Sequence, residues 1–153
     1  MGRHQVMGWG YEGRGLDELL QDAERWGVTA VVDVRLNPIS RKRGLSKTAL
    51  RTALEGQGVQ YVHLPSLGNP KDNRAAFAET QTEAGRSARA RFVDEVLSTP
   101  EADEALGFVE ELQESGPVLL LCFEASERLC HRALVIDALQ RRARADEERL
   151  ALA

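Results

Sequence analysis

Two cysteines, two glutamates, a histidine and two arginines lie close together in the stretch VLLLCFEASERLCHR. Its apolar first half has the length of a strand and ends in Cys122 and Glu124. A short polar loop follows, after which Cys130-His131-Arg132 open a predicted helix. Because partial positive charge gathers at a helix N-terminus, this stretch could hold an anion or generate a reactive thiolate.

The cysteines and the histidine allow three interpretations. Cys130 could be a small buried side chain, with His131 on the helix surface and Arg132 paired with a nearby glutamate. Cys130 could instead be a nucleophile, activated by the helix N-terminus and nearby cations. Metal binding by Cys122, Cys130, His131 and a carboxylate is chemically feasible, but the usual zinc pattern of two closely spaced ligand pairs is missing. We rank structural and ligand-binding roles first, the nucleophile second and the metal site third, and we assign no metal ligands and no cofactor.

Polar side chains also follow the other predicted strands. Asp33 lies inside an apolar strand, where an unpaired carboxylate is costly, and Arg35 points to the same side of that strand. We therefore expect an Asp33–Arg35 pair, which either ties down a loop or orients Arg35 to clamp a phosphate or carboxylate. The candidate catalytic residues are Glu12, His63, Glu124, Cys130 and His131, and the candidate ligand-binding residues are Tyr11, Asp33, Arg35, Asn37, Ser40, Arg41, Cys122 and Arg132.

A parallel sheet would bring these residues together. Apolar runs of strand length alternate with helical periodicity, a pattern typical of α/β proteins. We expect strands from Gln5 to Trp9, Val28 to Val34, Gln60 to Leu64 and Val118 to Cys122, and a last helix from about Glu127 to Arg144. The predicted fold is a single three-layer α/β/α sandwich over residues 1–153, with a mainly parallel sheet of about four strands in the order 3-2-1-4. That order places the ligand crevice between the Tyr11-Glu12 loop and the Cys122–Glu124 loop.

The hydrophobic pattern fades between Pro65 and Gly85. We expect a mobile polar segment there, with one short helix around Arg74 to Glu79. A connection of this length is usually functional or disordered, so the segment could close over the site as a lid.

Composition is ordinary for a soluble globular protein, with 42% apolar and 29% charged residues among 153. No window reaches the ~20 apolar residues of a membrane helix, and the N-terminal residues lack the apolar core of a signal peptide. We therefore expect a cytoplasmic protein that does not associate with membranes. In that compartment the two cysteines should be free thiols.

The net charge of −4 is unevenly distributed. Six basic residues and no acid lie between Val34 and Leu54, whereas ten acids and no base lie between Phe92 and Glu127. These runs predict either two solvated faces of opposite sign, or a basic patch that faces an anionic ligand or a phosphate backbone.

Four segments of the chain resemble a known family, the domain of unknown function 488. They are GYEGRGLDELL (10–20), VVDVRLNPISRKRGLSKTAL (31–50), YVHLPSLG (61–68) and LLLCFEASERLCHR (119–132). The resemblance implies the α/β sandwich and a site built from the polar residues in these segments, and Cys130-His131-Arg132 matches the family's most recognisable tripeptide. It implies no substrate.

The leading hypothesis is an enzyme, or an enzyme-like domain, that acts on a phosphate-bearing ligand such as a nucleotide or a nucleic-acid end. Arginines would bind the phosphate and a glutamate or histidine would move protons, with Arg35, Arg41 and Arg132 in the first role and Glu12, Glu124 or His63 in the second.

Two alternatives remain open. One is a nucleic-acid-binding module without chemistry, which would use the basic loop 35–51 and bind with a steep salt dependence. That loop contains no aromatic residue on which bases could stack. The other alternative is a thiol, redox or metal site at Cys122, Cys130 and His131.

Overall fold

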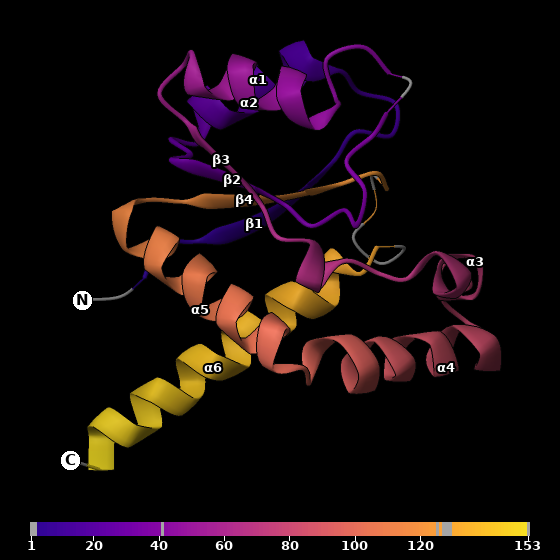
Figure 1. The fold of residues 1–153 in the computed structure, drawn as a ribbon. Helices are drawn as coiled ribbons and strands as arrows, with labels where there is room; N and C mark the ends of the chain where they lie inside the picture. Colours follow the sequence, from indigo (N-terminus) through magenta and orange to yellow (C-terminus); the bar gives the residue numbers. More distant parts are fainter. Residues whose placement is uncertain (1–2, 41, 125, 127–129, 153) are drawn as a thin grey trace.

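The computed structural model, which describes residues 3–40, 42–124, 126 and 130–152, contains one four-stranded parallel sheet. The strands lie in the order β1 (Val6–Gly10), β4 (Val118–Cys122), β2 (Ala30–Asp33) and β3 (Gln60–His63). Helices α1 (Leu16–Arg25) and α2 (Lys47–Glu55) cover one face, and α5 (Pro100–Ser115) and α6 (Arg132–Leu152) cover the other (Figure 1). The predicted α/β fold with a mainly parallel sheet of about four strands is confirmed.

Alternating side chains of the central strands fill two separate cores. Val31 and Leu119 pack with the residues of α1 and α2 on one face. Val32 and Leu120 pack with the residues of α5 and α6 on the other. A strand that is buried on both faces needs a nearly continuous apolar sequence, as β4 has.

The strand order differs from the predicted 3-2-1-4, because β4 lies between β1 and β2. All five residues of β4 are buried, whereas the first three residues of β1 are only partly buried. The strand with the most apolar sequence, β4, therefore takes one of the two inner positions, where a neighbour covers each edge. The predicted neighbours β1 and β4 are still paired, with Gly10 opposite Cys122.

The segment predicted to be irregular, Pro65 to Gly85, is instead built largely of short helices. These are η1 (Pro65–Leu67), η2 (Lys71–Asn73), α3 (Arg74–Phe77) and the start of α4 (Glu83–Arg91), which runs into the π-helical η3 (Phe92–Leu97). Phe77 and Ala88 are buried in the core on the α5 and α6 face. The short helix expected around Arg74 to Glu79 is present as α3. Sequence periodicity missed the other short helices of this segment because each contributes few apolar residues.

The packing of α4 against α3 depends on Gly85. A Cβ at this position would lie 1.7 Å from the backbone oxygen of Glu79, an approach that only movement of the chain could relieve. We therefore expect Gly85→Ala to lower the free energy of unfolding by about 1–3 kcal/mol, measured by urea denaturation.

Gly107→Ala is the matched control, since Gly107 also lies inside a helix, α5. Its Cβ would contact only the Arg142 guanidinium, at 3.7 Å. Helix propensity alone then predicts a gain of about 1 kcal/mol. Equal effects at the two glycines would show that the close approach at Gly85 is not structurally important.

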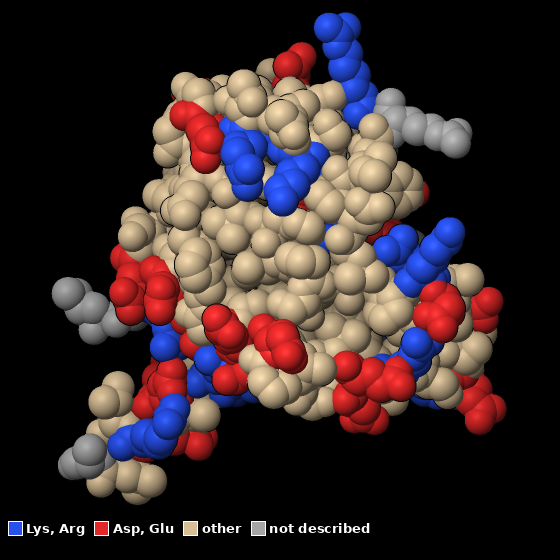
Figure 2. All heavy atoms as spheres, viewed as in Figure 1, with Lys and Arg blue, Asp and Glu red and all other residues tan. Residues whose placement is uncertain are grey.

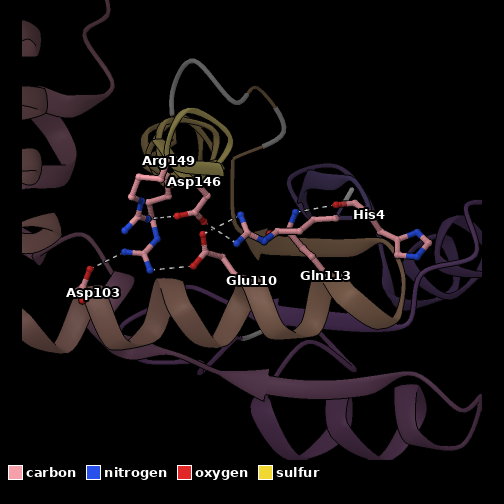
Figure 3. A network of polar contacts seen from close by, with 8 residues as sticks. His4, Asp103, Glu110, Gln113, Asp146 and Arg149 are labelled. Carbon is pink, nitrogen blue, oxygen red and sulfur yellow. Dashed lines mark hydrogen bonds and ion pairs between the residues drawn. The ribbon is translucent and has the colours of Figure 1, made fainter. Parts of the chain in front are cut away.

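Ion pairs hold the C-terminal helix to α5 and to the N-terminal residues (Figure 3). Arg142 donates to Asp103 at 2.5 Å and to Glu110 at 2.9 Å, and Arg3 donates to Asp146 at 2.8 Å. Helix α6 continues past the predicted end at Arg144 to Leu152. The predicted start at Glu127 lies outside the described residues.

The charge separation seen in the sequence is visible on the surface. Acidic side chains gather along α5, and basic side chains stand on the part of the molecule nearest α2 (Figure 2). No helix in the described part of the chain has both the length and the apolar character that a membrane span requires.

Candidate functional site

A cavity of about 150 Å³ opens at the carboxyl ends of β1, β4 and β2. Side chains from four separate parts of the chain line it, namely Tyr11, Arg35, Leu36, Asn37, Ile39, Asn69, Arg74, Phe77, Cys122, Phe123, Glu124 and His131. Six of these are candidate site residues from the sequence: Tyr11, Arg35, Asn37, Cys122, Glu124 and His131.

The strand order explains why these segments meet. The Tyr11 amide donates to the Cys122 carbonyl at 3.2 Å, and the Val34 amide donates to the Leu121 carbonyl at 3.1 Å, so the loop after β4 lies between the loops after β1 and β2. The chain leaves β1 and β2 toward α1 and α2, but leaves β4 toward α6 on the opposite face (Figure 1). Loops that diverge in this way leave a crevice at the carboxyl ends of the strands, which is where ligands bind in open α/β sheets.

The predicted Asp33–Arg35 pair is confirmed and is buried. The Arg35 Nε donates to the Asp33 Oδ1 at 2.8 Å, and its Nη2 donates to Oδ2 at 2.6 Å. The Tyr61 hydroxyl donates to the same Oδ2 at 2.6 Å, and the Arg35 Nη1 donates to the Leu45 carbonyl at 2.8 Å. Burial and the hydrogen bond to Asp33 raise the pKa of Tyr61, so its hydroxyl remains protonated as the donor.

Arg35 both holds the loop and lines the cavity, so the two predicted roles are compatible. Burial tends to lower the pKa of the Arg35 guanidinium, but its hydrogen bonds and charge attraction to Asp33 outweigh burial and raise that pKa. The guanidinium lies over the Tyr11 ring, 5.4 Å from its centroid. Asp33 neutralises much of its charge, so Arg35 alone gives the cavity little net positive potential.

Arg74 and Asn69 line the cavity, and sequence reasoning missed both. The Arg74 Nε donates to the Asn69 carbonyl at 3.2 Å. The buried Asn73 amide donates to the Asn69 Oδ1 and to the Ala88 carbonyl, both at 2.9 Å, and so fixes the turn. The signal in the sequence is the Asn69-Pro70 dipeptide, which is typical of a turn and lies six positions after the end of β3.

His131 lies at the back of the cavity in a defined tautomer. Its Nε2 is 3.0 Å from the Val34 carbonyl oxygen, which can only accept, so Nε2 carries the proton. Its Nδ1 therefore presents a lone pair, 3.7 Å from the Cys130 Sγ. Burial lowers the pKa of His131 to about 4, with smaller contributions in the same direction from Arg74 and Arg132, so the ring is neutral at pH 7.

The expectation of free thiols is wrong for this structure, because Cys122 and Cys130 form a disulfide. The disulfide joins the end of β4 to Cys130, just before α6, which begins at Arg132, the last residue of the predicted Cys130-His131-Arg132 opening. The buried Arg132 Nη1 lies 2.9 Å from the Cys122 Sγ and 2.5 Å from the Glu124 carbonyl oxygen. In the disulfide form neither cysteine is a thiolate nucleophile.

The remaining candidate residues are not among the described lining residues of this cavity. Asp33, Cys130 and Arg132 lie behind it and support residues that do line it. His63 contacts the Arg35 carbonyl oxygen through Nε2 at 2.7 Å, Ser40 accepts from the Lys42 amide, and the Glu12 amide donates to the Phe123 carbonyl. Arg41 lies outside the described residues.

Several cations of the basic loop 35–51 contact the protein itself. Lys42 donates from Nζ to the carbonyl oxygens of Tyr11 and Arg14, at 2.8 Å in each case. Arg51 lies over the Tyr61 ring, 5.3 Å from its centroid. Together with Arg35, which is bonded to Asp33, at least three basic side chains of this loop contact other parts of the protein and stabilise the fold.

Comparison with known proteins gives a family and nothing more specific. The model of the family described as Domain of unknown function DUF488 matches residues 15–139. No curated protein and no solved structure matches the chain. The match includes most of the cavity's lining residues, with Tyr11 just before its start.

Proposed function

Because this chain belongs to the DUF488 family, whose description names no activity, we propose a function from the cavity itself: it binds the phosphate group of a small ligand. Arg74 provides the free positive charge. Arg35, Asn37 and Asn69 surround the same space with further N–H donors.

The position of Arg74 supports the proposal most strongly. Among the described residues, no carboxylate lies within ion-pairing distance of Arg74. The one side-chain hydrogen bond that Arg74 makes to these residues goes to the Asn69 carbonyl. Its charge is therefore not cancelled as that of Arg35 is. A guanidinium that lines a cavity beside neutral amide donors favours an anion with several oxygens.

The size of the cavity limits what it could hold. Pockets that enclose drug-sized ligands usually measure about 300–1,000 Å³. At about 150 Å³, this cavity is suited to one end of a ligand rather than to a whole nucleotide. We therefore favour a terminal phosphate, with the remainder of the ligand outside the cavity.

Glu124 is the residue best placed to act on such a ligand. It is the one acidic side chain among the described lining residues, and its Oε2 lies 3.6 Å from the Cys122 Sγ. A carboxyl group at this position could transfer a proton to or from the bound group. This role of Glu124 depends on phosphate binding.

We also keep the sequence-based proposal that the protein is cytoplasmic.

Removing Arg74 should weaken binding without harming the fold, because Arg74 is exposed. We expect Arg74→Ala to reduce the affinity for inorganic phosphate or pyrophosphate by about tenfold to a hundredfold, the usual worth of a charged hydrogen bond. Isothermal titration calorimetry of the two anions measures this directly.

Arg86→Ala is the matched control, since Arg86 is an exposed arginine on α4 and is not among the described lining residues. It should bind both anions like the native protein. If native protein bound neither anion, or if both variants lost affinity equally, the proposal would be wrong. Strong oligonucleotide binding that Arg74→Ala leaves unchanged would favour the nucleic-acid module instead.

A further inference from the structure

Three metal-ligating side chains converge next to the cavity. The Cys122 Sγ, the Cys130 Sγ and one ring nitrogen of His131 all lie within 4.8 Å of one another, and all three residues are buried. They come from the end of β4 and from the residues at the start of α6. Two sulfurs and an imidazole are the donor set that Zn²⁺ prefers.

The tautomer of His131 suits metal binding. Its Nε2–H donates to the Val34 carbonyl at 3.0 Å, which leaves the lone pair of Nδ1 directed toward the Cys130 Sγ. Imidazoles that bind metals commonly donate their other N–H to a backbone carbonyl, which fixes the ring.

The backbone leaves room for an ion between the cysteines. Their Cα atoms are 7.5 Å apart, beyond the 4.4–6.8 Å that disulfides usually span. In a zinc site each sulfur lies about 2.3 Å from the metal, so the two sulfurs separate while the backbone stays in place.

Charge and the fourth coordination position also fit. Two thiolates would neutralise a divalent cation, and the buried Arg132 Nη1, 2.9 Å from the Cys122 Sγ, would donate a hydrogen bond to one of them. Glu124 is 3.6 Å from the same sulfur and lines the cavity, so the fourth ligand would be its carboxylate or a molecule in the cavity.

We propose that the reduced protein binds one Zn²⁺-like divalent cation through Cys122, Cys130 and the Nδ1 of His131. A dithiol reductant first converts the disulfide into two thiols and is itself oxidised to a disulfide. The two thiols then release two protons as their sulfurs bind the cation. The disulfide is thus the metal-free state of the same site, and the proposal does not depend on phosphate binding.

Cobalt provides a direct test. The full-length protein is reduced with a phosphine under argon, since a phosphine takes up oxygen from water and leaves two protein thiols. It is then titrated with Co²⁺. We expect one ion per chain, thiolate-to-cobalt charge-transfer absorption, the visible bands of a tetrahedral site, and displacement by Zn²⁺. The oxidised protein should show none of these.

Matched variants identify the ligands. Cys130→Ser and His131→Gln should each weaken Co²⁺ binding by more than about 100-fold, beyond the 10–100-fold typical for supporting residues. His63→Gln is the control, because the His63 Nε2 also contacts a backbone carbonyl, that of Arg35, outside the cluster. Circular dichroism establishes that each variant folds.

Two results would overturn the proposal without depending on any variant. One is reduced native protein that shows no charge-transfer absorption at saturating Co²⁺. The other is oxidised protein that binds Co²⁺ as tightly as reduced protein does. A protein that failed to bind phosphate could still bind the metal ion. The experiments therefore distinguish failure of the phosphate-binding proposal from failure of the metal-binding proposal.

Discussion

Asp33→Asn should lower the free energy of unfolding by about 3–5 kcal/mol, the usual result of removing one partner of a buried ion pair. The carboxylate is completely buried and accepts two hydrogen bonds from the Arg35 guanidinium and one from the Tyr61 hydroxyl. An amide of the same shape keeps the volume but leaves the Arg35 charge buried without a counter-ion. Urea denaturation followed by circular dichroism measures the loss.

The double variant Asp33→Asn/Arg35→Met separates charge from packing. With both charges gone, no uncompensated ion remains, so the double variant should be more stable than Asp33→Asn alone. If the second substitution only added to the loss, the pair would not behave as a coupled ion pair. Since the free energy of unfolding of a domain is about 5–15 kcal/mol, Asp33→Asn should still fold under stabilising conditions, and its stability can be measured there.

Phe92→Ala should cost about 3–5 kcal/mol as well, through a cavity in the core. Phe92 is fully buried, and its ring meets the edges of the Phe77 and His131 rings, with centroids 6.2 and 5.4 Å away. Both neighbours line the cavity at the sheet edge. The substitution should therefore also change the nuclear magnetic resonance signals of the His131 ring.

Phe108→Ala is the control for size and chemistry. Phe108 lies on α5 and is 39% exposed, so truncating it should change stability by less than about 1 kcal/mol and leave His131 unaffected. A His131 signal that stays unchanged in Phe92→Ala would show that the π-helical segment does not position the ring.

The sequence could predict the elements whose apolar pattern is strong. The strand Val118–Cys122 was predicted at its observed bounds, because five consecutive apolar residues leave little ambiguity. The Asp33–Arg35 pair was predictable because a carboxylate inside an apolar strand needs a partner. Both inferences use local information only.

The parts that were missed depend on long-range packing. Strand order depends on which strand can be buried on both faces, and the more apolar sequence of β4 favours an inner position over that of β1. Arg74 reaches the cavity because Asn73 fixes the turn at Asn69 through the Ala88 carbonyl, fifteen residues away along the chain. Local sequence patterns give no information about a contact between residues so far apart along the chain.

The cysteines illustrate the same limit. Cys130 lies eight positions after Cys122, a spacing that fits no familiar metal-binding pattern. They meet because the chain turns back from the end of β4 to the start of α6, and His131 joins them through the Val34 carbonyl of a neighbouring strand end. The sequence offered these three residues as possible metal ligands, but their spacing along the chain does not show that the fold brings them together.

Phosphate binding at the cavity is the central claim, and a titration of ¹⁵N-labelled protein with inorganic phosphate tests it most directly. We predict saturable shifts of the Arg74 Nε–H and of the Asn37 and Asn69 side-chain amides, while the Arg86 Nε–H stays unchanged. Shifts confined to the basic loop, or no saturable shift at the cavity, would contradict the account.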